Sequence, residues 1–444
     1  MSKVVSRVSI IIECLMFALV IAGVIHALSY LQNTGKLPQP FFINANDTLM
    51  DWINPTYWAH NRGAYYAYES VYPPLSFVFL RFFSIPSCYR FDNIADRDCD
   101  WLAPVVLLTF YAFAIAAVFG VYWKRDRKTA IFRAVAIVLG TPMLYAVERG
   151  NLIVVCFLFF VLAEGRLLKS RIVKTISSAL MINFKPYLIL TLAAHMIKRR
   201  WRWVEAVAIW GLLIYLVTFG LYGDGNPAQL IQNEIGFGSP PNTIVNLEWS
   251  FFNSTYITFY HLIQSSFDMT HFVGSQPVEL MEWWIPTLIH IGQIGVVLCF
   301  LGALWKPHIA TTYRLTALSI AVVLTSTNAG GYSQVLLFFL VLMERWEGPA
   351  TITAIIVTYL LSIPVDIPIT TLAYSAGVSW LTNREVGVEI SLTVGQIARP
   401  GLVLIIQYAL ICATLSKLGK EVFRQAVQWR RASGAASPPL GEPA

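Results

Sequence analysis

The first long apolar run of the chain, VSIIIECLMFALVIAGVIHALSYL at residues 8–31, decides the class of protein. Its only ionisable side chains are Glu13 and His26. About 20 apolar residues span the ~30 Å hydrocarbon core of a bilayer, so this run is long enough to cross it. It is too long for the apolar part of a signal peptide and lacks a cleavage site of small residues. We therefore predict an uncleaved first span.

Composition extends this interpretation to the whole chain. The 444 residues are 56% hydrophobic and 13% charged, whereas about 25% of the residues in soluble domains are charged. Nine further apolar runs lie at residues 102–123, 133–147, 152–165, 204–222, 285–305, 311–327, 332–344, 350–363 and 400–416. We predict an all-α polytopic membrane protein of about 10–12 transmembrane helices. Residues 1–431 would form a single integral membrane domain, and residues 432–444 a disordered cytoplasmic tail.

The segment between Lys174 and Lys198 is too short for two complete spans. Both lysines mark the same side of the membrane, and Asn183-Phe184-Lys185-Pro186 interrupts the segment halfway. Proline disfavours helical backbone at the residue before it and removes a hydrogen-bond donor, so we predict a hairpin of two short legs. Irregular backbone at this depth has to be buried in protein or line a wet cavity. Lys185, at the tip, is therefore a candidate functional residue.

The distribution of charge orients the spans. With the N-terminus in the cytoplasm, the inner loops contain 23 of the 32 Lys and Arg residues, and the outer loops contain 8 of them and 17 of the 25 acids. This asymmetry follows the positive-inside rule and predicts cytoplasmic N- and C-termini. The net charge of +7 then reflects topology and contact with anionic lipid, and no nucleic-acid partner is expected.

The long loops lie on the predicted outer side, at residues 32–101, 223–284 and 364–399. Long loops in compact proteins are usually functional. The first contains two acids, Asp47 and Asp51, and we expect two aromatic-rich helices after them that rest on the membrane surface. Cys88 and Cys99 lie close together in the same loop. An oxidising compartment permits a disulfide between them, and two free thiols are the alternative.

Further polar groups lie at the outer ends of the apolar runs. They are Glu148-Arg149-Gly150-Asn151 between two spans, Lys185 at the hairpin tip, Asn253 in the second outer loop and Tyr332 at the start of a late span. Ionisable residues at membrane depth are expensive and tend to be functional. The simpler interpretations are an ion pair of Arg149 with Glu148 or with a lipid phosphate, snorkelling of Lys185, and Tyr332 as an ordinary interface aromatic.

Taken in order, these motifs resemble the multi-span glycosyltransferases of the GT-C superfamily. They are most similar to glycosyltransferase family 87, which uses polyprenyl-phosphate sugars and includes bacterial mannosyltransferases. The likeness rests on Asp51, Tyr72-Pro73-Pro74-Leu75, Arg149-Gly150-Asn151 and Lys185-Pro186, and it extends to about residue 345. Members often carry a His or Asp near the outer end of a late span, where this sequence has Gly330-Gly331-Tyr332.

The resemblance implies an inverting glycosyltransferase in the bacterial plasma (inner) membrane, with its active site on the extracytoplasmic face. A sugar, mannose or another hexose, would move from a polyprenyl-phosphate donor to a lipid-linked or polysaccharide acceptor. A carboxylate would take the proton of the acceptor hydroxyl, and cations would stabilise the departing phosphate. We expect no metal and no other cofactor.

Each candidate residue has a role in this scheme. Asp51 is the expected general base because its context resembles the single acid of the family. Asp47 follows Asn46, is typical of a turn or helix cap, and is the alternative base; a third possibility is that both acids only solvate the loop. The donor phosphate is expected at Arg149, Lys185 and Asn151. The expected substrate-binding residues are Trp52, Tyr57, Tyr65, Tyr72, Glu148, Asn253 and Tyr332.

Other functions are compatible with the same residues. A transporter or flippase of lipid-linked or small polar substrates would use similar charges at membrane depth, although no inverted repeat is evident. A polysaccharide polymerase or ligase would also act on the outer side. Such enzymes usually depend on Arg and His in a very long late loop, and residues 364–399 contain two Arg and no His. A structural subunit without catalysis is the fourth alternative.

Overall fold

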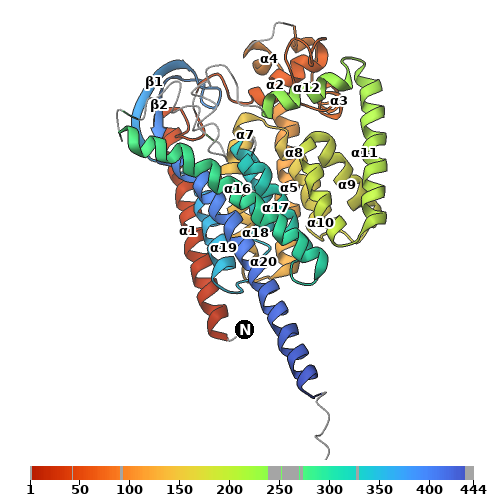
Figure 1. Cartoon of the computed structure of the whole chain (residues 1–444). Coiled ribbons are helices and arrows are strands. Elements are labelled where there is room, and N and C mark those ends of the chain that lie inside the picture. The colour runs from red at the N-terminus through yellow and green to blue at the C-terminus, as the bar shows by residue number, and fades with distance from the viewer. Residues whose placement is uncertain are drawn as a thin grey trace, which may run out of the picture.

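The computed structural model describes residues 3–42, 44–90, 94–238, 252, 270, 274–326 and 330–435 as a mostly helical bundle (Figure 1). In this part of the chain, six helical segments are long and apolar enough to cross a membrane. They are α1 (Lys3–Thr34), α5 (Leu102–Arg125), α6 (Ala130–Val138) continued by α7 (Thr141–Arg149), α11 (Trp201–Tyr222), α16 (Ser275–Trp305) and α20 (Val394–Ala435). The chain is thus a helical membrane protein, as the sequence predicts.

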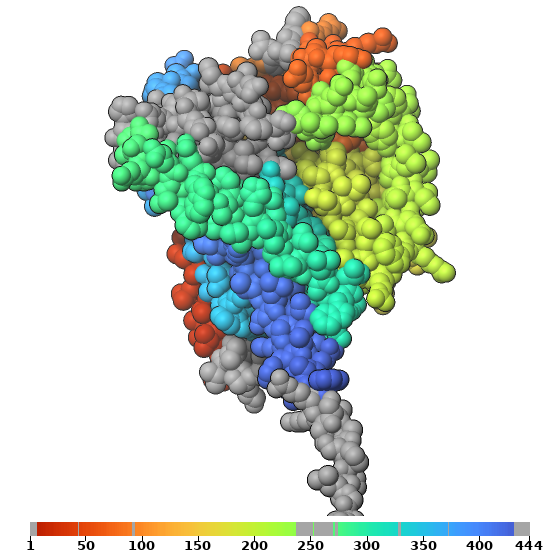
Figure 2. Space-filling model, in the orientation of Figure 1, coloured from red at the N-terminus to blue at the C-terminus, as the bar shows by residue number. Residues whose placement is uncertain are grey.

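The long helices present apolar side chains to their surroundings. On α11, for example, Ile209, Leu212 and Leu216 are each more than half exposed. An apolar exterior of this extent is expected where the neighbour is lipid. In Figure 1, α1 and α11 lie at opposite edges of the bundle. Figure 2 shows α16 running diagonally across one face, where it packs on α17 and α20.

Four of the ten expected spans form shorter helices. They are α8 (Ile153–Glu164), α17 (Thr312–Ser326), α18 (Gln334–Val341) and α19 (Pro349–Ser362). At 1.5 Å per residue they extend about 12–23 Å, which is less than the ~30 Å hydrocarbon core. Nearly all side chains of α8, α17 and α18 are buried. Their apolar side chains therefore pack mainly inside the protein, and these four helices are shorter than the expected full spans.

The segment between Lys174 and Lys198 forms the predicted hairpin. Its legs are α9 (Arg171–Phe184) and, after the short helix η2 (Pro186–Leu190), α10 (Thr191–Ile197). Lys185 has extended backbone immediately before Pro186, where the first leg ends. The α9 helix packs against α8 and α11. This arrangement places Lys185 at the tip of a hairpin held inside the bundle.

A buried ion pair joins the N-terminal helix to the rest of the bundle. The carboxylate of Glu13 is fully buried and accepts hydrogen bonds from Arg133 Nε at 2.9 Å and Nη2 at 2.6 Å. Trp346 Nε1 and the Tyr359 hydroxyl also donate to it, at 2.6 and 2.9 Å. Because four donors satisfy this carboxylate, it connects α1 to α6 and α19 without an unpaired charge.

The first outer loop contains more structure than two surface helices. It forms α2 (Met50–His60), α3 (Pro74–Phe82), the short helix η1 (Pro86–Cys88) and α4 (Ile94–Cys99). The α2 helix packs against α3, and it buries one side, including Trp52 and Ile53. The two expected helices correspond to α2 and α3, and together with η1 and α4 they form a cap over one end of the bundle (Figure 1).

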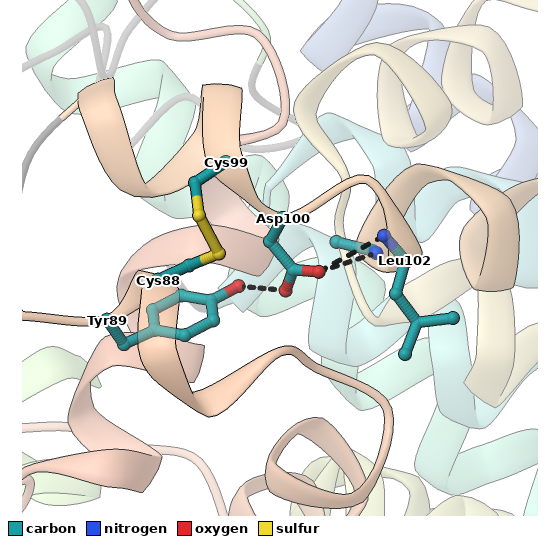
Figure 3. The surroundings of a disulfide bond; sticks show 6 residues. Cys88, Tyr89, Cys99, Asp100 and Leu102 are labelled. Carbon is teal, nitrogen blue, oxygen red and sulfur yellow. Dashed lines mark hydrogen bonds between the residues drawn. A yellow bond between two sulfur atoms is a disulfide. The ribbon is translucent and has the colours of Figure 1, made fainter.

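A disulfide joins Cys88 to Cys99, with 5.6 Å between their Cα atoms (Figure 3). The residues that follow the two cysteines, Tyr89 and Asp100, add hydrogen bonds beside the disulfide. The Tyr89 hydroxyl donates to Asp100 Oδ2 at 2.5 Å, and Asp100 Oδ1 accepts the backbone N–H of Leu102 at 3.1 Å. The predicted disulfide is confirmed, and together with Asp100 it determines where α5 begins.

The late outer loop contains strands, which corrects the expectation of an all-α chain. β1 (Pro368–Val378) pairs with β2 (Glu385–Thr393) in an antiparallel hairpin. Alternate residues of β2 face inward, and Val386 and Val388 are buried against Phe42 of the first outer loop. The sequence EVGVEI has this period of two, typical of a strand with one buried face.

The start of α1 and the end of α20 lie at the end of the bundle opposite α2, α3 and the helix α12 (Pro227–Gly238) (Figure 1). The α20 helix continues to Ala435, so the first four residues of the expected disordered tail are helical. The remaining tail residues, 436–444, and most of the second outer loop, including Asn253, lie outside the described residues.

Candidate functional site

The candidate site lies at the end of the bundle covered by α2 and α3, where four connecting segments of the chain meet. The loop before α2 supplies Asp47, the first turn of α2 supplies Asp51, the turn between α7 and α8 supplies Arg149, and the hairpin tip supplies Lys185. The short helix η3 (Gly331–Ser333), which precedes α18, supplies Tyr332. Residues that are distant in sequence are therefore brought together at one end of the bundle.

The turn between α7 and α8 depends on a glycine. Gly150 ends α7 with a φ of 68°, in the left-handed region where side chains are disfavoured. A Cβ atom at this position would lie 3.0 Å from the Cα and carbonyl oxygen of Leu49. Glycine thus serves both the turn and the close approach of the first outer loop. This explains the middle residue of Arg149-Gly150-Asn151.

Arg149 bridges the two acids of the first outer loop. Its Nη1 lies 2.5 Å from Asp47 Oδ2, and its Nη2 lies 3.0 Å from Asp51 Oδ1. Asn151 Nδ2 donates to the other oxygen of Asp51 at 2.8 Å, and Asn151 Oδ1 accepts the backbone N–H of Ile153 at 2.9 Å. Each oxygen of Asp51 is therefore held by an oriented donor. The side chains of Arg149, Asp47 and Asp51 are 19%, 28% and 22% exposed, so the group remains accessible.

Glu148 stabilises the segment of the first outer loop that precedes α2. It is buried, its Oε1 accepts a hydrogen bond from the Thr48 hydroxyl at 2.8 Å, and its carbonyl oxygen accepts the N–H of Leu49 at 2.9 Å. Leu49 has a φ of 65°, which costs a residue with a side chain roughly 1–2 kcal/mol. The alternative interpretation, an ion pair between Arg149 and Glu148, is not found among the described contacts, and the burial of Glu148 fits support rather than substrate binding.

Lys185 is the cation of the site without an acidic partner. Its Nζ lies 4.6 Å from the ring centroid of Tyr72 and 5.7 Å from that of Tyr332, within the range of cation–π attraction. Within the described part of the chain, this ammonium group has no hydrogen bond or ion pair. Its charge is close enough to Asp51 to interact with it. Three N–H donors are thus available to an anionic ligand.

Two tyrosines complete the surroundings of Lys185. Tyr72 and Tyr332 both lie near Asn151 and Asp51. Burial raises the pKa of Tyr72 well above its usual range, and the nearby Tyr332 and Asp51 act in the same direction. The Tyr72 hydroxyl therefore stays protonated, so it can donate a hydrogen bond to a ligand and cannot serve as a base near neutral pH.

Two other expected aromatic residues belong to the core. Trp52 is fully buried and packs edge-on against Phe79, with 5.8 Å between ring centroids. Tyr65 is 2% exposed, and its hydroxyl donates to the carbonyl oxygen of Tyr72 at 3.0 Å. Their burial corrects the expectation that they contact substrate. Tyr57 is half-buried on α2, and Asn253 is outside the described residues.

Sequence reasoning missed α12, which lies beside the site. Asn233 Nδ2 donates to the carbonyl oxygens of Tyr65 at 3.0 Å and Ser70 at 3.1 Å, and these bonds attach α12 to the first outer loop. The next residue, Glu234, has its pKa raised by burial, while the nearby Lys185 lowers it. The sequence signal for this helix was the spacing of isoleucines at positions 231 and 235, with the acid Glu234 between them. Apolar residues four apart beside a polar one are typical of an amphipathic helix.

Among the residues described, no group of three or more His, Cys, Asp or Glu side chains is arranged to hold a metal ion. Comparison of the chain with protein-family models, curated proteins and solved structures finds no match. The chemistry of the site therefore carries the functional conclusion. This chemistry combines a positioned carboxylate with a desolvated cation at one end of a membrane-embedded bundle.

Proposed function

We propose that the chain is an inverting glycosyltransferase that moves a hexose, such as mannose, from a polyprenyl-phosphate donor to a lipid-linked or polysaccharide acceptor. One observation carries the proposal: Asp51 is held by two donors, and the unpaired ammonium group of Lys185 lies close to it. A lipid-borne donor would reach this end of the bundle from the bilayer. The resemblance to glycosyltransferase family 87 supports the same reaction, because the motifs that carry it meet at this site.

Asp51 would be the general base. As the acceptor oxygen bonds to the anomeric carbon, the bond from that carbon to the phosphate oxygen breaks, and the proton of the hydroxyl passes to Asp51. A carboxylate can accept about four hydrogen bonds. The contacts with Arg149 and Asn151 occupy two positions, so Asp51 keeps room for the acceptor hydroxyl. Attack from the face opposite the phosphate inverts the anomeric configuration.

Lys185 is the better ligand for the donor phosphate. Arg149 has the geometry to bind a phosphate, but its two terminal nitrogens are engaged by Asp47 and Asp51. The polyprenyl phosphate gains charge as it leaves the sugar, and a cation aimed at it stabilises the transition state. We therefore assign the phosphate to Lys185, with the hydroxyls of Tyr72 and Tyr332 beside it. Arg149 and Asn151 would position the base.

We place the site on the extracytoplasmic face of a bacterial plasma membrane. The basic residues concentrate in the loops predicted to be cytoplasmic, and the start of α1 and the end of α20 lie at the end of the bundle opposite the site. Cytoplasmic loops carry an excess of Lys and Arg, which supports this orientation. The disulfide between Cys88 and Cys99 lies at the site's end of the bundle, in agreement with an oxidising compartment.

The test is transfer of radiolabelled sugar from a polyprenyl-phosphate sugar in membranes that contain the wild type, Asp51→Asn or Asp47→Asn at matched expression. Asp51→Asn should lose about 10²–10⁴-fold in rate, the usual contribution of a general base. Asp47→Asn should keep more activity, because the carboxylate of Asp47 bonds only to Arg149 among the described residues. Glu385→Gln, which alters an exposed acid of β2, is the matched control.

The other outcomes are equally informative. Loss in Asp47→Asn alone would move the base to Asp47 and keep the reaction. Equal activity in all variants would eliminate the acid pair as the source of the base. Absence of transfer by the wild type would contradict the donor class and favour a transporter of lipid-linked substrates.

A further inference from the structure

A cavity of about 530 Å³ opens beside the acid pair, between the first and last outer loops. Three elements form it: the loop before α2, the helix α4 held by the disulfide, and the turn between β1 and β2. Its volume lies within the range of about 300–1,000 Å³ typical of small-molecule sites. The lining residues are Asn46, Ile94, Arg97, Asp98, Val378, Ser379, Trp380 and Asn383.

One lining residue indicates that a polar ligand belongs in this cavity. Ser379 is fully buried, yet its hydroxyl has no hydrogen-bond partner within the described part of the chain. Buried polar groups are nearly always hydrogen-bonded, and an unsatisfied one is costly. Asn46 and Asn383 add side-chain amides to the same cavity. A ligand with hydroxyl groups would supply the missing partners.

The charges around the cavity favour a neutral ligand. Arg97 Nε lies 3.1 Å from Asp98 Oδ1, and Arg97 Nη1 donates to the carbonyl oxygens of Asn46 at 3.1 Å and Thr48 at 3.4 Å. The cation of the cavity is thus already engaged and neutralised, so an anion would find no free partner. An alkyl chain would leave the Ser379 hydroxyl unsatisfied.

The remaining wall fits the ring of a sugar. Trp380 is half-buried and offers an aromatic surface, and an indole ring combines a large apolar face with low conformational freedom. The apolar face of a pyranose ring can pack on such a surface while its hydroxyls reach Ser379, Asn46 and Asn383. This combination of one aromatic face and several neutral hydrogen-bonding groups selects saccharides over apolar or anionic molecules.

The cavity is also connected to the acid pair. The two carbonyl groups that Arg97 binds belong to the residues on either side of Asp47, and Asn46 itself lines the cavity. The hairpin is anchored in place because the Thr382 hydroxyl donates to the carbonyl oxygen of Gly35 at 2.7 Å. A sugar in the cavity would therefore lie directly beside the loop that carries Asp47 and Asp51.

We infer that this cavity binds a neutral saccharide, the end of the acceptor that is presented to Asp51. The inference rests on the proposed function and deepens it, because it names the acceptor as a neutral glycan and places it between α4 and the β-hairpin. The donor phosphate and the acceptor sugar would then be held by separate groups, the first at Lys185 and the second at Ser379 and Trp380.

The test is binding of mannobiose, a neutral disaccharide, to the full chain in lipid nanodiscs, measured by saturation-transfer NMR without donor. Trp380→Ala should weaken binding about tenfold. Ser379→Ala removes one hydrogen bond and should weaken binding roughly threefold to tenfold. Since that hydroxyl has no partner in the described structure, Ser379→Ala should leave the thermal stability unchanged or raised. Trp101→Ala, which changes an exposed Trp outside the cavity, should bind like the wild type.

This measurement separates the two proposals, because it does not depend on catalysis. No binding by the wild type, or unchanged binding by both cavity variants, would overturn the saccharide site even if sugar transfer is observed. Binding that responds to Ser379→Ala and Trp380→Ala, with no transfer from the polyprenyl-phosphate donor, would support the saccharide site and refute the glycosyltransferase. Ser379→Ala keeps the test decisive if Trp380→Ala fails to fold.

Discussion

Replacing Lys185 by Met separates the function of this residue from its contribution to stability. Methionine has a similar length but no charge, so Lys185→Met removes the ammonium group from between the rings of Tyr72 and Tyr332. If Lys185 binds the donor phosphate, sugar transfer should fall sharply. The protein should nevertheless remain folded, since no carboxylate among the described residues forms a hydrogen bond or ion pair with this lysine.

The size of each effect follows from the contacts. Removing a cation aimed at the developing charge of a leaving group costs about 10²–10³-fold in rate. For stability, the cation–π contacts at 4.6 and 5.7 Å contribute about 0.5–2 kcal/mol each. Lys185 is half-buried, and the desolvation of its unpaired ammonium group opposes these contacts. The two effects offset each other, so we expect a change in stability within about 1–2 kcal/mol.

The assay pairs radiolabelled sugar transfer with thermal unfolding in detergent. Lys185→Arg keeps the charge and should retain more transfer than Lys185→Met, and Lys420→Met, which alters an exposed lysine of α20, should match the wild type in both readouts. Wild-type transfer by Lys185→Met would refute the phosphate assignment. A large loss of stability in this variant would show that the lysine has a structural partner, and its ammonium group would then not be free to bind a phosphate.

Three further substitutions test the support of the site and of the bundle. Gly150→Ala forces a left-handed alanine against Leu49, so it should cost at least about 1–2 kcal/mol and lower sugar transfer; unaltered transfer would contradict the close approach. Glu13→Gln leaves Arg133 buried without a carboxylate, and a loss of about 3–5 kcal/mol should appear as a lower unfolding temperature in detergent. Cys88→Ser should destabilise the outer cap by roughly 2–4 kcal/mol, and reductant should then change the wild type but not the variant.

Much of the bundle could be predicted because a helix that crosses lipid must be long and apolar. The long helices such as α5 and α11 were predictable from length and composition, and the hairpin from two lysines and a proline. The short helices α8 and α18 were not, since an apolar run has the same composition whether its neighbours are lipid or protein. Only the packing distinguishes them, and packing depends on residues far away in the sequence.

The first and last outer loops contain features that were not predicted from the sequence. The sequence did not predict the pairing of Arg149 with Asp51, because no spacing rule relates residues 98 positions apart. Trp52 was expected on a ligand surface because aromatic residues serve both cores and binding sites. The β-hairpin was detectable in principle from the alternation at residues 385–390, but a strand of this length is easily overlooked in a chain that is apolar throughout.

Arg149 and Lys185 carry the same charge but have different roles in this site, and the neighbours of each cation determine its role. Arg149 lies between two carboxylates that would otherwise repel each other, and its planar, bidentate geometry suits that position. A phosphate bound to both terminal nitrogens would compete with the two aspartates for Arg149 and so disturb the base. Lys185 forms no ion pair among the described residues. Its compact ammonium group can therefore turn toward a phosphate without disturbing Asp51. Dividing positioning and phosphate binding between the two cations allows donor to enter while the base keeps its orientation.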